Sequence, residues 1–217
     1  MTTTTTTTTL KFSGKELLAL AKSCGSPDRY QISHLMITPW ELVTTNGHFL
    51  TVITPNGGFP LSAPSFLEST RLLDLRATDV CRIHADGIHA TSKRGNTTVI
   101  PFTELEGDYP DISQVIPDLG SGEVAAYAGF GIDVLSSFFA VVTAFGVNAI
   151  KFNTPADQLT PATVQSRRES SVSKSGEGEP QVDIYGVIMP LRLDGDYLDF
   201  HRALADRKVE AEKSAAA

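Results

Sequence analysis

The feature that most constrains how this chain can fold is a recurring unit, a short strand followed by a helix and three further strands. The first copy begins with LKF and the segment SGKELLALAKSC, where Ser13 and Glu16 have capping-box spacing and predict a helix from about Gly14. Three strand-like runs follow, YQISHLMIT, ELVTT and HFLTVIT. The dipeptide Asn46-Gly47 between the last two predicts a hairpin with a type I′ turn.

The second copy opens at GFPL, and Ser62 is placed to cap a helix over APSFLESTRLLDL, residues 63–75. A proline is tolerated in the first turn of such a helix. Three more strand candidates follow, DVCRIH, GIHATS and NTTVIPF. Asp86-Gly87 and Arg94-Gly95-Asn96 supply the turns between them.

The third copy opens with EVAAYA and an apolar helix over residues 132–145, followed by the strands NAIKFN, TPATVQSRR and VDIYGVIMPLRL. The composition of ESSVSKSGEGEPQ predicts a mobile loop between the last two strands. The chain closes with DYLDFHRALADRKVEAEK, which predicts an amphipathic helix. Its apolar face would comprise Tyr197, Phe200, His201 and Leu204.

These units divide the chain into four parts and indicate an α+β fold. A threonine-rich arm (1–9) precedes a domain of two units (10–117), a half domain of one unit (118–193) and the tail (194–217). Residues 134–150 carry no charge and raise the alternative of a membrane span. A span usually needs about 20 apolar residues, and this stretch contains Ser, Thr, Asn and Gly, so a buried helix followed by a strand is preferred.

Composition argues against several classes of function. The net charge of −7 argues against a broadly basic nucleic-acid-binding surface, although it leaves room for a local basic face. Cys24 and Cys81 have no CxxC partner, so no metal or other cofactor is expected, and reduced thiols are typical of a cytoplasmic protein. No GxSxG, HExxH or P-loop motif is present, and GFGIDV lacks the rest of a dinucleotide loop. The chain is therefore not expected to be an enzyme.

Three segments stand out from this background. LVTTNGHFLTV reads as an ordinary hairpin, and EGDYPDISQVIP reads as a linker packed on the surface. The third is VIMPLRL, an apolar strand that ends in Met-Pro-Leu-Arg-Leu. Proline cannot donate a hydrogen bond inside a sheet, and exposed leucine side chains are unfavourable in water. This ending is therefore typical of a binding surface rather than of an ordinary strand.

Taken together and in this order, the three segments resemble the bacterial sliding clamp, the beta subunit of DNA polymerase III. That family has a TDGHRL-type hairpin in its middle domain, an FPDYxxVxP-type segment leading to its last domain, and a final strand of the VMPMRL type. The corresponding stretches here are TTNGHFL, YPDISQVIP and VIMPLRL, and the likeness covers most of residues 10–193. It implies a DNA-clamp-like fold of repeated β-α-β-β-β units, about one and a half clamp domains per chain.

The resemblance also implies a hydrophobic pocket that binds short peptides of DNA polymerases, clamp loaders and repair proteins. Phe49 and Gln114 stand where the family often has arginine, which should alter the preference for peptides. Carried over by motif, the implied pocket residues are Ile32, Thr45, Gly47, His48, Leu50, Pro110, Val115, Val187, Met189, Pro190, Leu191, Arg192 and Leu193.

A ring of this family contains twelve units, and this chain supplies three. The third unit is expected to lack its partner half and to pair with a second chain, which predicts a homo-oligomer, a tetramer in preference to a trimer or dimer. Duplex DNA would be held without sequence preference by Lys15 and Lys22 on the first helix and Arg71 on the second. The third helix offers no cation.

Two functions follow from the resemblance. The first is a ring-forming processivity factor that tethers replication proteins to DNA in the cytoplasm of a bacterial or phage-infected cell. The alternative is a non-encircling module that recruits or sequesters the same proteins. The tail continues past the usual family end and is expected either to narrow the pocket or to pack on a neighbouring subunit.

Overall fold

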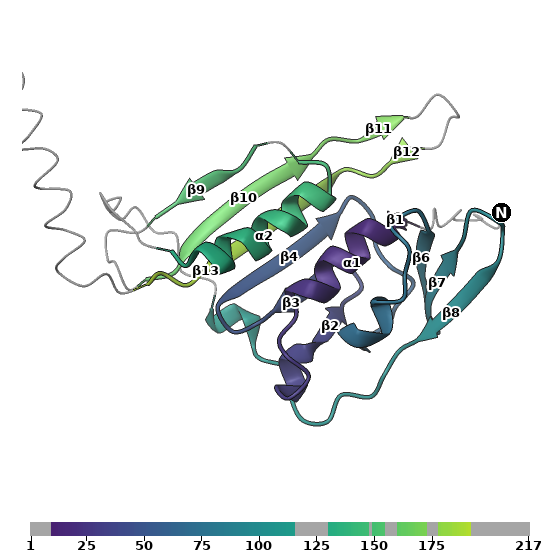
Figure 1. Cartoon of the computed structure of the whole chain (residues 1–217), viewed down its shortest axis with the longest axis horizontal. Helices are drawn as coiled ribbons and strands as arrows, with labels where there is room; N and C mark the ends of the chain where they lie inside the picture. The colour runs from purple at the N-terminus through teal and green to yellow at the C-terminus, as the bar shows by residue number, and fades with distance from the viewer. Residues whose placement is uncertain (1–9, 116–129, 148, 155–159, 173–177, 192–217) are drawn as a thin grey trace, which may run out of the picture.

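The computed structural model describes residues 10–115, 130–147, 149–154, 160–172 and 178–191, which form two antiparallel sheets and two α-helices (Figure 1). β1 (Lys11–Ser13) leads into α1 (Gly14–Ser23), and the predicted capping box between Ser13 and Glu16 is confirmed. The smaller sheet has the order β1-β6-β7-β8. Its later strands are β6 (Val80–His84), β7 (Gly87–Thr91) and β8 (Thr97–Pro101).

The larger sheet has seven strands in the order β5-β2-β3-β4-β13-β10-β9. It draws on all three sequence units, and a separate two-stranded ribbon, β11 with β12, extends from it. The strands are β2 (His34–Ile37), β3 (Leu42–Thr45), β4 (Phe49–Pro55), β5 (Ser65–Glu68), β9 (Lys151–Asn153), β10 (Ala162–Arg168), β11 (Ser171–Val172), β12 (Gly178–Glu179) and β13 (Val182–Ile188). The helices are α2 (Ile132–Ala144) and the 3-10 helices η1 (Tyr30–Ser33), η2 (Ser69–Leu72) and η3 (Ile112–Gln114).

The central feature of this sheet is the antiparallel pairing of β4 with β13, from Val182↔Pro55 to Ile188↔Phe49. The expectation that the third unit lacks a partner within the chain is therefore wrong, because its last strand pairs with the first unit. The predicted boundaries at 117/118 and 193/194, and the tail itself, lie outside the described residues.

Helices α1 and α2 lie side by side on one face of the large sheet, and the main core is formed between them and the strands (Figure 1). Phe138 of α2 is fully buried and sits over Gly186 of β13, where an added Cβ would come within 2.3 Å of the ring. Only one face of α2 is buried, and Ile132 on the other is 83% exposed. In the described part of the chain, no helix is long and apolar enough to cross a membrane.

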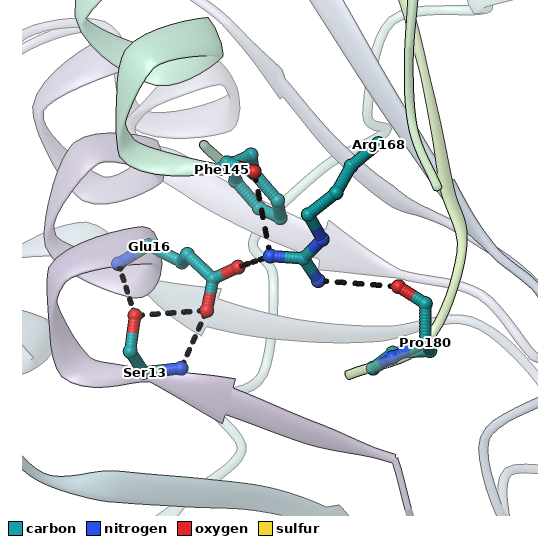
Figure 2. A network of polar contacts seen from close by, with 5 residues as sticks. All are labelled: Ser13, Glu16, Phe145, Arg168 and Pro180. Carbon is teal, nitrogen blue, oxygen red and sulfur yellow. Dashed lines mark hydrogen bonds and ion pairs between the residues drawn. The ribbon is translucent and has the colours of Figure 1, made fainter. Parts of the chain in front are cut away.

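A buried polar network ties the first unit to the third (Figure 2). Glu16 accepts hydrogen bonds from the backbone and side chain of Ser13, and its other oxygen lies 2.5 Å from the guanidinium of Arg168 on β10. Arg168 also donates to the carbonyls of Phe145 and Pro180, each at 3.4 Å. Because both charged side chains are almost fully buried, this pair fixes the start of α1 against β10, and the bond from Arg168 to Phe145 extends the link to the end of α2.

The predicted helix over residues 63–75 is wrong, since this segment forms β5 and η2. β5 pairs with β2 from Ser65↔Ile37 to Glu68↔His34. A strand places Leu67 in the main core and Phe66 on the opposite face, where its ring lies 5.8 Å from that of Tyr109. Tertiary pairing thus overrides the helical pattern of the isolated segment.

Two smaller expectations also change. The turn between β3 and β4 is not type I′, because Gly47 has φ 88° while no residue other than glycine has positive φ among the described residues. Positive φ at the first central position alone is the type II′ pattern, and the side-chain oxygen of Asn46 accepts from the backbone of His48 and Phe49. The predicted loop before β13 is also partly ordered, because β11 pairs with β12 at its two ends.

Candidate peptide-binding site

The face of the large sheet away from the helices carries a second, smaller apolar cluster. Side chains alternate along β4, so Phe49 and Ile53 enter the main core and Leu50 and Val52 point to the outer face. Leu50 pairs with Val187 of β13. We call the buried residues Val43, Leu50, Val52 and Val187 the outer-face cluster.

A covering segment (residues 105–115) lies over the outer-face cluster. Tyr109 and Ile112 pack against it, and the Tyr109 hydroxyl donates to the carbonyl of Val43 at 3.5 Å. Burial raises the pKa of Tyr109, so this phenol stays neutral. Asp111 caps η3 by accepting from the backbone of Ser113 at 3.0 Å, and hydrogen bonds from Ser113 lower the pKa of Asp111. The segment is therefore held by side-chain packing on the cluster and by its own capped turn rather than by sheet pairing.

Apolar side chains remain exposed around the edge of this arrangement. Met189 is 40% exposed and Val115 is 37% exposed. The backbone of Met189 donates to the carbonyl of His48 at 3.0 Å, which holds the end of β13 against the β3–β4 hairpin. This edge joins the three segments singled out in the sequence.

Most of the predicted pocket residues lie on these elements. Leu50 and Val187 are in contact within the cluster, and Thr45, Gly47 and His48 form the adjoining hairpin end. The exposed residues Pro110 and Val115 lie on the covering segment, and Met189 and Pro190 follow β13.

Two predicted residues lie to the side of the cluster, and two fall outside the described chain. Ile32 packs against Gly25 and near Gly47, where its Cδ1 would lie 3.7 Å from an added Cβ. Leu191 lies toward the start of α2, 3.9 Å from the Cβ position of Gly131. Arg192 and Leu193 are outside the described residues.

The sequence analysis missed four residues that complete this site. Val43 and Val52 belong to the cluster, and Tyr109 and Ile112 cover it. The signal for the valines was the two-residue alternation of LVTT and HFLTVIT, which puts every second side chain on the outer face. The covering residues have no such signal, because only the tertiary fold brings the linker over the sheet.

The predicted DNA-contacting residues lie on the helix side of the molecule. Lys15 and Lys22 are exposed on α1, and Arg71 is exposed on η2 with Glu68 at 3.7 Å. The exposed face of α2 is different in character, since an apolar hollow of about 590 Å³ runs along it. Among the residues that line it are Ile132, Leu135, Phe139 and Ala140, with Lys15 as the cation at its edge.

Comparison with known proteins gives a match in structure and none in sequence. No protein-family model and no curated protein matches the chain. The DNA polymerase III subunit beta of Pseudomonas aeruginosa is 16% identical with a TM-score of 0.50, covering 89% of this chain and 69% of that chain. A ligand-bound DNA polymerase sliding clamp of the same organism is 16% identical with a TM-score of 0.53, covering 85% and 66%. A putative DNA polymerase III beta subunit of Eubacterium rectale is 11% identical with a TM-score of 0.50, covering 85% and 66%.

The chain thus spans about two thirds of the length of the clamp proteins that it matches. At these identities the likeness establishes the fold. The DNA-clamp-like α+β fold implied by the three sequence segments is confirmed, and the resemblance to bacterial sliding clamps is confirmed as a likeness of architecture.

Proposed function

We propose that this chain is a sliding-clamp-like protein that binds short peptide segments of replication proteins and assembles into a homo-oligomeric ring on duplex DNA. The observation that carries the proposal is the meeting of the hairpin, the covering segment and the end of β13 around one apolar cluster, within a clamp-like fold. A DNA polymerase and a clamp loader are the proposed partners. No chemical step is part of this function.

A peptide would bind by shifting the covering segment and placing an apolar side chain beside the outer-face cluster. Burying about 300 Å² of apolar ligand surface gives roughly 7 kcal/mol at ~25 cal/mol/Å². Ordering the peptide and moving the covering segment offset much of this gain, so micromolar and exchangeable binding is expected. The partly exposed residue Met189 suits such a site, because methionine adapts to varied apolar partners.

The test is fluorescence polarisation with a labelled clamp-binding peptide from a replicative polymerase. Met189→Glu should abolish binding, because it places a charge in an apolar wall. Val99→Glu is the matched control, since Val99 is 46% exposed on β8 in the smaller sheet. Equal affinity of both variants and the parent protein would place the peptide elsewhere.

The proposed interface between copies is the apolar face formed by α2 and β9. Ile132 is 83% exposed, Phe139 is 36% exposed, and Phe152 on β9 is 38% exposed and 6.5 Å from the Phe139 ring. β9 also ends the seven-stranded sheet, so within the described part of the chain no further strand pairs with its outer edge. A second copy of this chain would cover both the face and the edge.

Sedimentation velocity at tens of micromolar should show an oligomer, and the measured mass separates a tetramer from a trimer or a dimer. Phe139→Glu should shift the population to monomer. Leu73→Glu is the control, because Leu73 is similarly exposed but lies after η2. A monomeric mass for the parent protein would contradict the proposed ring.

A non-encircling peptide-binding module is the second candidate, and one observation favours it. Helix α2 contains no cation and the hollow along its exposed face is mostly apolar, so this helix offers no positive charge to DNA. Retention on nicked circular DNA and loss from linear DNA separates the two functions. A ring slides off free ends, whereas the module shows no such difference.

A further inference from the structure

A cavity of about 610 Å³ lies beside the start of α1, between the loop that follows η2 and the β7–β8 hairpin. The buried side chains of Ala90 and Ile100 form part of its wall. A regular helix over residues 63–75 is absent here, because that segment forms β5 and η2. The cavity is therefore bordered by Arg71, Asp74 and Leu75, which end the segment expected to form a helix.

Cations gather around this cavity in a chain whose net charge is −7. Arg71 and Arg76 approach it from the η2 side, and Lys93 and Arg94 approach it from the turn between β7 and β8. Among the described residues, no hydrogen bond or ion pair engages the side chains of Lys93 and Arg94. These two charges are therefore available to a ligand.

The acidic residues at the cavity offset only part of this charge. Among the described residues of the lining, Asp74 and Asp79 are the two carboxylates, against four cations. One oxygen of Asp79 accepts from the backbone of Arg76 at 2.8 Å, so this carboxylate shapes the loop. The lining keeps a surplus of positive charge.

The cavity is also bordered by the ordered turn between β7 and β8. Ser92 lines it, and the Ser92 hydroxyl is buried without a hydrogen-bond partner among the described residues. Backbone bonds from Ser92 to Asn96 and from Gly95 to Ser92, both 2.9 Å, hold the turn that presents Lys93 and Arg94. The two exposed cations are therefore held at a defined place beside the cavity.

We propose that this cavity, rather than the exposed face of α2, binds the sugar-phosphate backbone of duplex DNA. Arginine, lysine and hydroxyl groups are the usual donors to phosphate oxygens. None of the described residues that line the cavity is aromatic, so this lining lacks the stacking platforms that sites for single strands use. The partner, duplex DNA, rests on the function proposed above, and the cavity adds the site that holds it.

The experiment measures binding of a labelled duplex to the full chain by fluorescence anisotropy across a salt series. Each phosphate contact contributes about 0.9 to the slope of log K against log[salt]. Arg94→Ala should lower the slope by about 0.9 and weaken binding roughly eightfold at 0.1 M salt. Lys93→Ala/Arg94→Ala should lower the slope by about 1.8.

Arg167→Ala is the matched control, because it removes the same charge from an exposed arginine on the outer face of the large sheet. It should leave the slope unchanged. Equal slopes for the parent protein and both cavity variants would overturn the cavity site while leaving DNA binding intact. A parent protein that binds the polymerase peptide but no duplex would overturn both the cavity and the ring. Tighter, cavity-dependent binding of a single strand of the same sequence would overturn the assignment to duplex.

Discussion

Replacing Arg168 by methionine should test whether the buried network in Figure 2 joins the first and third units. Methionine keeps much of the volume and removes the charge. Among the described residues, the donors left to the buried Glu16 carboxylate would then be the backbone and side chain of Ser13. Arg168 also lies 5.8 Å from the Phe145 ring centroid, so a cation–π contact is lost as well.

The size of the effect follows from burial. The side chains of Glu16 and Arg168 are 5% and 12% exposed, and removing one partner of such a pair costs about 3–5 kcal/mol. With a urea dependence of roughly 2–3 kcal/mol/M, the denaturation midpoint should fall by about 1–2 M. Arg167→Met is the control, because the Arg167–Asp183 pair is half-exposed and such pairs contribute at most ~1 kcal/mol.

Urea denaturation followed by far-UV circular dichroism measures these midpoints. The double variant Glu16→Gln/Arg168→Met should be more stable than Arg168→Met alone, since it removes the unpaired buried charge. A midpoint for Arg168→Met equal to that of Arg167→Met would refute the reasoning. So would a double variant less stable than Arg168→Met.

Burial raises the pKa of both Cys24 and Cys81 from 9.0 to about 12, so their thiols should react slowly with a disulfide reagent at pH 8 and rapidly after unfolding. The pKa of each thiol is higher in the folded state than in the unfolded state, so the folded protein should keep its full stability below pH 9.0. Its free energy of unfolding should fall as the pH rises toward about 12, because the unfolded thiols ionise first, and urea titrations at alkaline pH would detect this loss. Gly186→Ala should destabilise by roughly 1–3 kcal/mol, because its Cβ would meet the Phe138 ring, and thermal denaturation measures this loss. Truncation after Leu193 should tighten peptide binding if the tail competes for the site, or lower the oligomeric state if it is an interface. No change in either polarisation or sedimentation would remove both roles.

Much of the fold could be predicted from local pattern. The capping box at Ser13 and Glu16 places α1 within one residue, and alternation places β3 and β4. The helix predicted over residues 63–75 was wrong for a tertiary reason. The apolar spacing of the segment suits a helix, but pairing with the edge of β2 stabilises a strand instead. Local pattern also says nothing of which strands meet, so the pairing of β4 with β13 could not be inferred.

The peptide-binding residues stay a prediction, but the sequence motifs lie on elements that meet in the fold. Short motifs locate the hairpin and the end of β13, and the structure brings Leu50 and Val187 together. The role of Tyr109 and Ile112 depends on where the linker crosses the sheet, which no periodicity encodes. The charged cavity is a further case, because its cations come from a loop and a turn that are distant in sequence.

The pairing of β4 with β13 has a consequence for how the chain folds during synthesis. Leu50 of β4 pairs with Val187 of β13. The central strand β4 therefore cannot complete its pairing until β13, the last described strand, has left the ribosome. Until then one edge of β4 is unpaired. Leu50 and Val52 on its outer face and Phe49 and Ile53 on its core face lack the side chains that β13 supplies. Such an edge invites pairing with another chain. Slow translation should therefore favour aggregation of nascent chains, and a trigger for productive folding should be the arrival of β13.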